Sequence, residues 1–113
     1  MPDVKEIARV CHEAYRGVCA AAGDTEQPAW LDAEQWQRDS MVRGVEAALA
    51  RPLASARDLH NAWVLDQLSA GWTYGKTRSA EARTHPSLVP FEQLPLIERA
   101  KDYVFRAVVD AMV

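Results

Sequence analysis

Side chains that could bind a flat, negatively charged molecule are concentrated in residues 60–86 of the 113-residue chain. Aromatic faces stack on heterocyclic rings, and an arginine can hold an oxyanion through two parallel N–H bonds. Imidazole and amide groups can read the polar edge of such a ring. The candidate ligand-binding residues are His60, Trp63, Gln67, Trp72, Tyr74, Arg78, Arg83 and His85. This pattern predicts a binding site for a small anionic or nucleotide-like ligand.

Three of the candidates have the spacing of one helix face. His60, Trp63 and Gln67 lie three and four residues apart, so their side chains project on the same side of a helix. We expect a ring to stack on a partly exposed Trp63 while His60 or Gln67 reads its polar edge. Arg78 and Arg83, on the following loop, would then reach an anionic tail. A core position for Trp63 fits the pattern about as well.

The remaining candidates also have structural interpretations. Trp72 is more typical of a core residue, because large aromatic side chains dominate the cores of small domains. His85 precedes a proline, and a polar group buried there is expected to find a partner within the fold. Residues 77–83 are polar and cationic, which is also the composition of a solvated loop. Residues 60–86 therefore contain both candidate ligand-binding residues and residues that could stabilise the fold.

The sequence carries no pattern typical of catalysis or metal binding. The carboxylates Asp58, Asp66 and Glu81 form no motif, and no serine or cysteine stands beside a histidine in a nucleophile elbow. The three histidines lie at positions 12, 60 and 85, which is no zinc spacing. We therefore expect a non-catalytic protein without a metal or other cofactor.

Composition and charge limit the partners. Hydrophobic residues make up 49% and charged residues 26% of the chain, which is typical of one globular domain spanning residues 1–113. The net charge of −3 disfavours general nucleic-acid binding. No apolar run approaches the ~20 residues that cross a bilayer, and the N-terminus lacks a signal-peptide pattern. These features predict a cytoplasmic protein without a membrane partner.

Capping patterns followed by apolar repeats predict four helices. Each cap pairs a residue that accepts from backbone N–H groups with a polar residue three positions later. The predicted helices are 4–22 capped by Asp3 with Glu6, 33–50 capped by Asp32 with Gln35, and 56–70 capped by Ser55 with Asp58. A fourth helix is predicted at 95–112, with Pro95 in its first turn. Gly23 and Gly71 are expected to end the first and third helices.

Short extended segments and two buried thiols complete the predicted architecture. At most short strands are expected around 72–74 and around 88–91, where two nearby prolines exclude a regular helix. Cys11 and Cys19 lie about 12 Å apart along a helix at 1.5 Å per residue, too far for a disulfide. Gly44 indicates close packing of a neighbour. The sequence thus predicts a mainly α domain of about four helices with short β segments.

The chain resembles the ryanodine receptor (RyR) domain family in its single-domain bacterial and phage form. The matching pieces are His60-x-x-Trp63, Gly71-Trp72-x-Tyr74-Gly75, a basic loop, His85-Pro86, Leu88-Val89-Pro90-Phe91, Leu94 and Lys101-Asp102. The chain departs from the family pattern at two places. Gln67 stands where a basic residue is expected, and Arg78-Ser79 replaces a frequent Lys-Asp.

The resemblance implies a mainly helical domain with short strands, without catalytic activity. It also implies ligand sensing, with nucleotides or nucleotide-derived signals as the ligands. In the large calcium channels such domains occur in adjacent pairs, so a lone copy is expected to form a homodimer with two-fold symmetry. A protein-interaction adaptor without a small-molecule ligand is the alternative.

Overall fold

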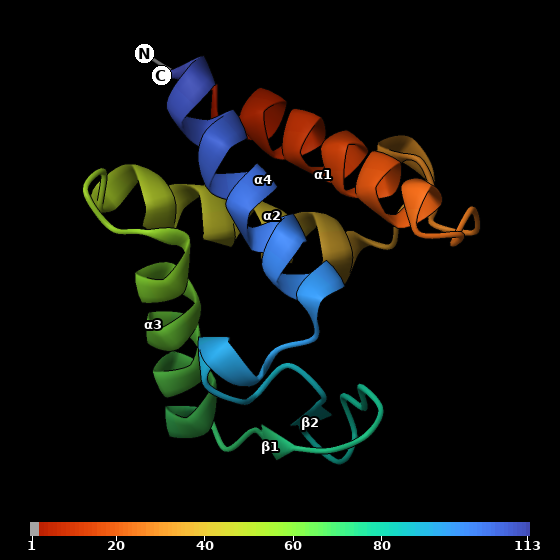
Figure 1. Ribbon diagram of the computed structural model, residues 1–113. Helices are drawn as coiled ribbons and strands as arrows, with labels where there is room; N and C mark the ends of the chain where they lie inside the picture. Colours follow the sequence, from red (N-terminus) through yellow and green to blue (C-terminus); the bar gives the residue numbers. More distant parts are fainter. Residues whose placement is uncertain (1–2) are drawn as a thin grey trace.

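The computed structural model describes residues 3–113, and over this range the protein is mainly α, as the sequence predicts (Figure 1). A short parallel sheet and two single-turn 3-10 helices complete the architecture. In chain order the elements are α1 (Val4–Ala21), η1 (Trp30–Asp32), α2 (Gln35–Ala50), α3 (Ala56–Ser69), β1 (Thr73–Tyr74), β2 (Thr84–His85), η2 (Phe91–Gln93) and α4 (Leu96–Met112).

Helices α1, α2 and α4 pack together around the main hydrophobic core. The first and last helices lie side by side along much of their length, and both described ends of the chain lie at the same end of the bundle (Figure 1). Small side chains let the helices approach closely. The residues of this core that are at most 1% exposed are Ile7, Ala8, Cys11, Val45, Ala48 and Val109.

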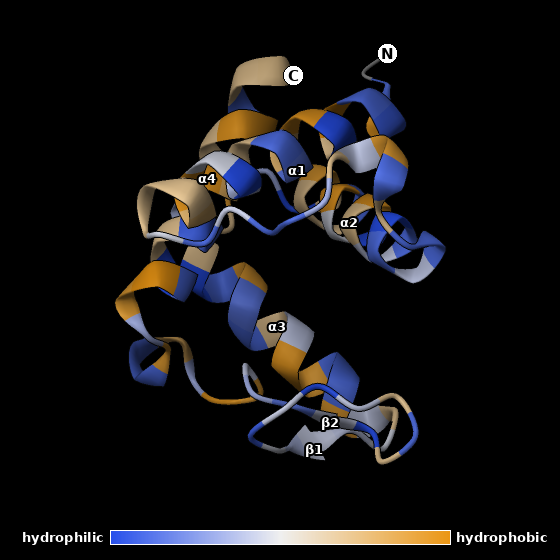
Figure 2. Cartoon of the chain, turned by 90° about the vertical axis from the view of Figure 1, so that its right-hand side faces the viewer, coloured by the Kyte–Doolittle hydropathy of each residue, from blue (hydrophilic) through white to orange (hydrophobic). Residues whose placement is uncertain are grey.

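Helix α3 extends away from this bundle and carries the β strands near its far end (Figure 2). The chain then returns along α3 to η2, where Phe91 and Leu94 pack against Ala56 in a second, smaller cluster. Helix α4 contacts both parts, because it packs on α1 and α2 and also on α3. The predicted site residues therefore lie mainly in the smaller part of the molecule.

The helix starts confirm two of the three predicted caps. Asp3 accepts from the backbone N–H groups of Lys5 and Glu6 at 3.1 and 3.3 Å. Ser55 and Asp58 cap each other, through Asp58 N to Ser55 Oγ at 3.1 Å and Ser55 N to Asp58 Oδ2 at 3.2 Å. These contacts satisfy N–H groups that a helix start leaves unpaired.

The predicted cap at Asp32 is wrong. Asp32 ends the 3-10 turn η1, and Ala33 after it is extended and buried. The same polar spacing recurs two residues later, where Gln37 Oε1 accepts from Glu34 N at 3.2 Å and α2 begins at Gln35. Pro95 precedes α4 as its N-cap residue.

The ends of α1 and α3 are as predicted. Gly23 and Gly71 have φ angles of 98° and 89°, in the left-handed region that favours glycine. Gly44 faces Phe105, whose ring lies 3.6 Å from where a Cβ would stand, so the predicted close neighbour is confirmed. Both thiols are free and buried, and burial raises the pKa of Cys11 to about 11.

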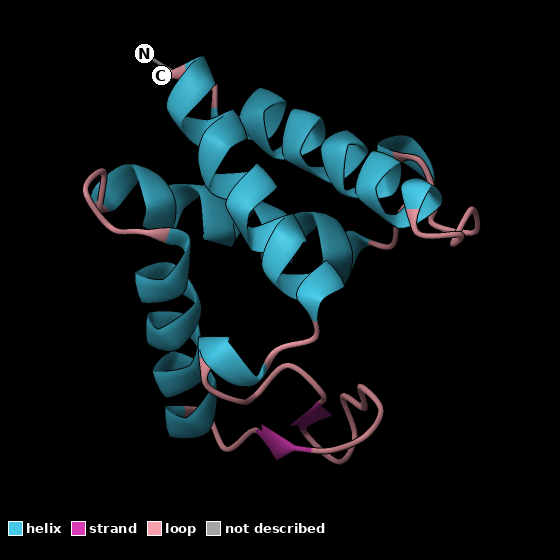
Figure 3. Ribbon diagram, in the orientation of Figure 1, coloured by secondary structure: helices cyan, strands magenta, loops and turns pink. Residues whose placement is uncertain are grey.

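Residues 88–91 form no strand, whereas the short strand expected near 72–74 is confirmed as β1 (Figure 3). The partner of β1 is β2, which pairs with it in parallel and in register Thr73 with Thr84 and Tyr74 with His85. Residues 86 and 90 are prolines, which cannot donate to a ladder, and Phe91 instead opens a 3-10 turn. Gly75 permits the close pairing, because a Cβ there would lie 2.5 Å from the Thr84 Cβ.

Within residues 3–113, no helix is both long and apolar enough to cross a membrane.

Candidate functional site

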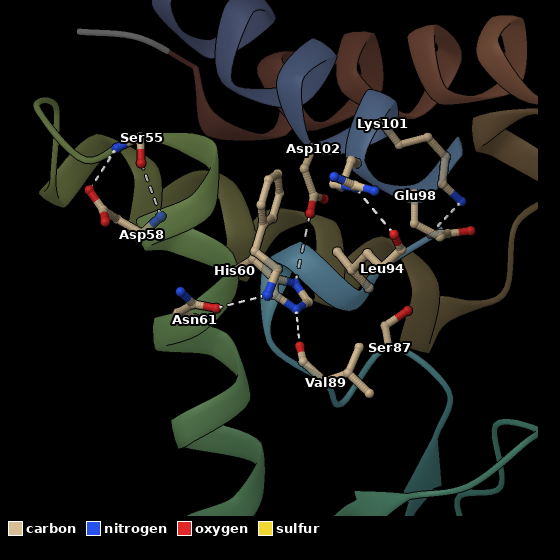
Figure 4. Close-up of polar contacts among 12 residues, drawn as sticks. Ser55, Asp58, His60, Asn61, Ser87, Val89, Leu94, Glu98, Lys101 and Asp102 are labelled. Atoms are coloured by element: carbon tan, nitrogen blue, oxygen red, sulfur yellow. Dashed lines mark hydrogen bonds and ion pairs between the residues drawn. The ribbon is translucent and has the colours of Figure 1, made fainter. Parts of the chain in front are cut away.

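His60 is a buried contact point between α3, the returning segment and α4 (Figure 4). Its Nε2 lies 2.8 Å from the carbonyl oxygen of Val89, and its Nδ1 lies 3.7 Å from Oδ2 of Asp102. A carbonyl only accepts, so Nε2 carries a proton and donates it. The segment after β2 folds over His60 and leaves it 9% exposed, so the domain itself covers this predicted ligand-binding residue.

Asp102 supplies the other half of this contact. Burial raises the pKa of Asp102 to about 6, while the neighbouring His60 acts to lower it. Two further charges on α4 act in opposite directions, since Glu98 raises this pKa and Lys101 lowers it. Lys101 and Glu98 are themselves paired at 3.0 Å. The His60 and Asp102 pair therefore joins the smaller part of the molecule to the bundle.

Trp63 packs between two imidazole rings. Its ring centroid lies 5.7 Å from that of His60 and 5.1 Å from that of His85, the second in an edge-to-face arrangement. The Trp63 side chain is half-buried. Gln67, one turn further along α3, is also half-buried, so the three residues share the inward face of the helix. These contacts favour the core interpretation of Trp63 over the ligand platform.

Arg83 is used inside the domain. Its Nη1 donates to the carbonyl oxygen of Ala70 at 2.9 Å, beside Gly71, where α3 ends. A cation at this position stabilises the carbonyl end of a helix. Arg83 also has a φ angle of 55°, which lets the chain turn into β2. The structure thus gives Arg83 a capping contact, in place of the expected approach to an anionic tail.

Arg78 has a different environment. The Cζ atom of its guanidinium lies 3.7 Å from the ring centroid of Trp36 and 5.5 Å from that of Trp72. It is exposed, and it forms no hydrogen bond or ion pair with any residue from 3 to 113. Contact with the aromatic faces leaves the N–H edge of the guanidinium available to an acceptor.

Trp36 is the residue that sequence reasoning missed. The helical repeat places it in the apolar series of α2, yet it is 42% exposed. Its Nε1 donates to Glu34 Oε2 at 2.6 Å, which orients the ring. The partner loop lies far away in sequence, so spacing carries no signal for the contact between Trp36 and Arg78.

The remaining predicted residues lie close to Arg78 in the chain. Tyr74 is 57% exposed, and Trp72 is half-buried, less than expected for a core tryptophan. His85 is half-buried, and its Nδ1 accepts from Ser87 N at 3.0 Å. Burial lowers the pKa of His85, and the charge of Arg78 lowers it further. The predicted structural partner of His85 is therefore found.

Two shallow depressions border the other end of the molecule. One lies along Glu13, Arg16 and Gln27, and the other along Arg9, Trp30 and Asp32. Neither contains any of the predicted ligand-binding residues, which belong to α3, the two strands and the loop between them.

The fold defines a small helical domain whose aromatic and cationic side chains gather around α3 and a two-stranded sheet. The family model of the RyR domain matches residues 34–112. The chain therefore belongs to the RyR domain family, which confirms the family that the sequence resembles. The match begins at the residue before α2, so α1 lies outside the matched residues.

Proposed function

We propose that this RyR domain is a non-catalytic binding module of the cytoplasm that senses a small anionic or nucleotide-like ligand. The observation that carries the proposal is the exposed guanidinium of Arg78, which lies against Trp36 and Trp72 without an acceptor among residues 3–113. An arginine in this state offers parallel donors to an anion and loses little side-chain freedom on binding.

Two exposed aromatic side chains suit the flat part of such a ligand. Tyr74 and Trp36 are both well exposed, at 57% and 42%. Stacking of a base on an aromatic side chain contributes about 1–3 kcal/mol. The site is therefore proposed on Trp36, Trp72, Tyr74 and Arg78, on the surface of the domain.

The non-catalytic part of the proposal rests on His60. This imidazole lies close to a carboxylate, as in many acid-base sites, but both of its nitrogens are directed at groups of the domain itself. It is also 9% exposed. A general base must come within hydrogen-bonding reach of its substrate. The contacts of His60 support a role in holding the fold.

Titration calorimetry with a panel of nucleotides and cyclic nucleotides tests the proposal. The wild-type protein should bind at least one member, and Trp36→Ala should weaken that binding about tenfold or more, because a stacking surface is lost. Leu31→Ala is the control, because Leu31 is 82% exposed and lies outside the proposed site. Equal affinity of the two variants for the bound ligand would contradict this placement of the site.

The alternative is an adaptor domain without a small-molecule ligand. Its support is the pair of exposed leucines on α3, Leu65 at 66% and Leu68 at 49%. Exposed apolar side chains that adjoin each other often mark interfaces. Native mass spectrometry of protein purified from its own host cell separates the two functions. A retained small molecule favours sensing, and a retained protein favours the adaptor.

A homodimer is the partner arrangement proposed with either function. Two-fold association is the commonest way to close an assembly. Light scattering should give twice the chain mass at high protein concentration, and a monomer mass there would reject the dimer.

A further inference from the structure

Helix α4 is apolar on two opposite faces. One face packs into the main core through Val109, which is fully buried, with Phe105 and Met112 beside it. The opposite face carries a second series of apolar residues at spacings of three and four, which place them on one side of a helix. The members of this series, called the outer stripe, are Leu96, Ala100, Tyr103, Ala107 and Ala111.

Residues 3–113 leave the outer stripe largely uncovered. Leu96 is 76% and Tyr103 58% exposed, and Ala107 and Ala111 are exposed as well. Phe91 meets the Tyr103 ring in an edge-to-face contact, with the centroids 5.6 Å apart. A helix that is apolar all round is typical of a buried helix. The outer stripe therefore has the composition of a surface that another molecule covers.

The outer stripe can pack against a second copy of itself. In a pair of antiparallel helices, a step forward along one helix is level with a step backward along the other. A two-fold axis through the middle of α4 thus sets Leu96 level with the partner's Ala111, so a large side chain meets a small one. It also sets Ala100 level with the partner's Ala107, and two alanines let helix axes approach to about 8 Å.

Two opposite charges border the outer stripe. Arg99 and Asp110 lie 11 residues apart, about three turns of helix, so they are on the same border. Arg99 Nε donates to Leu94 O at 3.2 Å, whereas its Nη atoms form no hydrogen bond or ion pair with any residue from 3 to 113. Arg106 contacts only Oδ1 of Asp110, at 3.1 and 2.6 Å, so Oδ2 has no donor among the described residues. The Asp110 side chain is 57% exposed.

The same two-fold axis brings these charges together. It keeps the border on the same side of both helices and reverses its direction, so Arg99 near the start of α4 faces the partner's Asp110 near its end. Symmetry repeats this contact at the other end of the helix pair. The outer stripe is thus complementary to itself in charge as well as in side-chain size, which favours a second copy of this chain as its partner.

We propose that two copies of the chain associate through α4, with the outer stripes packed antiparallel about an axis between Tyr103 and Val104 and with Arg99 paired to the partner's Asp110. The proposal rests on the homodimer proposed above and names the surface that forms it. A contact through one helix of 17 residues is a small interface. We therefore expect a dissociation constant of about 1–100 µM.

Sedimentation equilibrium of the full chain over this concentration range measures the association. Ala107→Glu places a carboxylate against the partner's Ala100, where it has no cation to pair with, and should weaken association about tenfold or more. Ala47→Glu is the matched control, because Ala47 is exposed on α2. Circular dichroism establishes that each variant is folded.

Charge reversal tests the pairing between subunits. Arg99→Glu alone opposes two carboxylates at both contacts of the dimer, and Asp110→Lys alone opposes two cations. Each variant should dimerise about tenfold more weakly than wild type. An equimolar mixture of the two variants has opposite charges at both contacts, so heterodimers should form with an affinity within about threefold of wild type. Native mass spectrometry identifies them by mass. A purely structural effect of either substitution would persist in the mixture.

The outcomes separate this interface from the homodimer and from sensing. If Ala107→Glu dimerises as well as wild type, or if the mixed variants form no heterodimer, the α4 interface is wrong and the homodimer uses another surface. If wild type remains a monomer at about 1 mM, the homodimer and the interface are both overturned. Sensing is judged by calorimetry with the nucleotide panel, whose failure leaves the association measurements unaffected.

Discussion

The imidazole of His60 on α3 and the carboxylate of Asp102 on α4 meet at 3.7 Å, from Nδ1 to Oδ2, with His60 Nε2 fixed on the Val89 carbonyl (Figure 4). Since Nε2 donates its proton to Val89, a lone pair on Nδ1 would face the carboxylate. Burial favours the protonated form of Asp102, and a proton on Asp102 removes the repulsion between this lone pair and the carboxylate. The contact is therefore favourable when Asp102 is protonated.

Asp102 should make the stability of the protein depend on pH. Burial raises its pKa to about 6 in the folded protein, from an ordinary value of 3.8, so the folded state binds the proton more tightly. The contribution of Asp102 to stability is then greatest below pH 3.8 and is lost as the pH rises towards about 6. Its size is about 2–3 kcal/mol at 1.36 kcal/mol per unit.

Denaturant unfolding of wild type and Asp102→Asn from pH 3.5 to 7 measures this effect. The variant lacks the Asp102 titration. Its free energy of unfolding, measured relative to that of wild type, should therefore increase as the pH rises. The difference between the two curves isolates Asp102 from the other carboxylates. Asp66→Asn is the control, because Asp66 is exposed on α3. A difference that stays constant with pH would contradict the raised pKa.

Trp63→Ala should destabilise the fold. The substitution leaves a void beside two imidazole rings, whose centroids lie 5.7 and 5.1 Å from that of Trp63. We expect a loss of about 2–4 kcal/mol in the free energy of unfolding, near the lower end for a truncated tryptophan. Leu65→Ala, on the exposed face of the same helix, should cost about 0.5 kcal/mol or less. Chemical denaturation followed by circular dichroism compares the two.

The two loop arginines should respond in opposite ways. Arg83→Gln removes the hydrogen bond to Ala70 O and should lower stability by about 1 kcal/mol. It should leave ligand affinity almost unchanged, because this guanidinium is directed at the end of α3. Arg78→Gln should weaken binding with little effect on stability. Thermal melting and calorimetry on both variants check this, and a reversed pattern would exchange their roles.

Helix α1 should be required for folding although it lies outside the family match. Ile7 is 1% exposed in the main core, so Ile7→Ala should cost about 2–5 kcal/mol. A chain reduced to residues 34–113 would expose the apolar faces of α2 and α4, including Val45 and Val109. We expect it to show no cooperative thermal transition by calorimetry. Cooperative unfolding of that fragment would show that the matched region forms its own core.

Local patterns predicted the helices because their signals lie within a few residues of one another. Ser55 and Asp58 cap the start of α3, and Gly71 has the left-handed angle that ends it. The error at Asp32 arose because the same polar spacing occurs twice, and the 3-10 turn η1 leaves only Glu34 and Gln37 at the start of α2.

Contacts between distant segments could not be read from spacing. The aromatic and imidazole stripe of α3 was recognised, but the chain that covers His60 returns from Val89. Nothing local indicates whether such a stripe faces solvent or is covered later in the chain. For the same reason, spacing could not predict the contact of Trp36 with Arg78, because Arg78 lies on the loop between the strands.

Arg106 of α4 places its Nη1 within 3.3 to 3.4 Å of three carbonyl oxygens, those of Ala48, Arg51 and Ala54, at the corner between α2 and α3. The same helix covers α1 along the bundle. During synthesis, α1, α2 and α3 leave the ribosome before α4 exists. Their apolar faces then remain exposed until α4 is available to cover them, so this domain should complete its folding only after α4 has emerged. Binding of a chaperone to the nascent chain should be strongest in that interval.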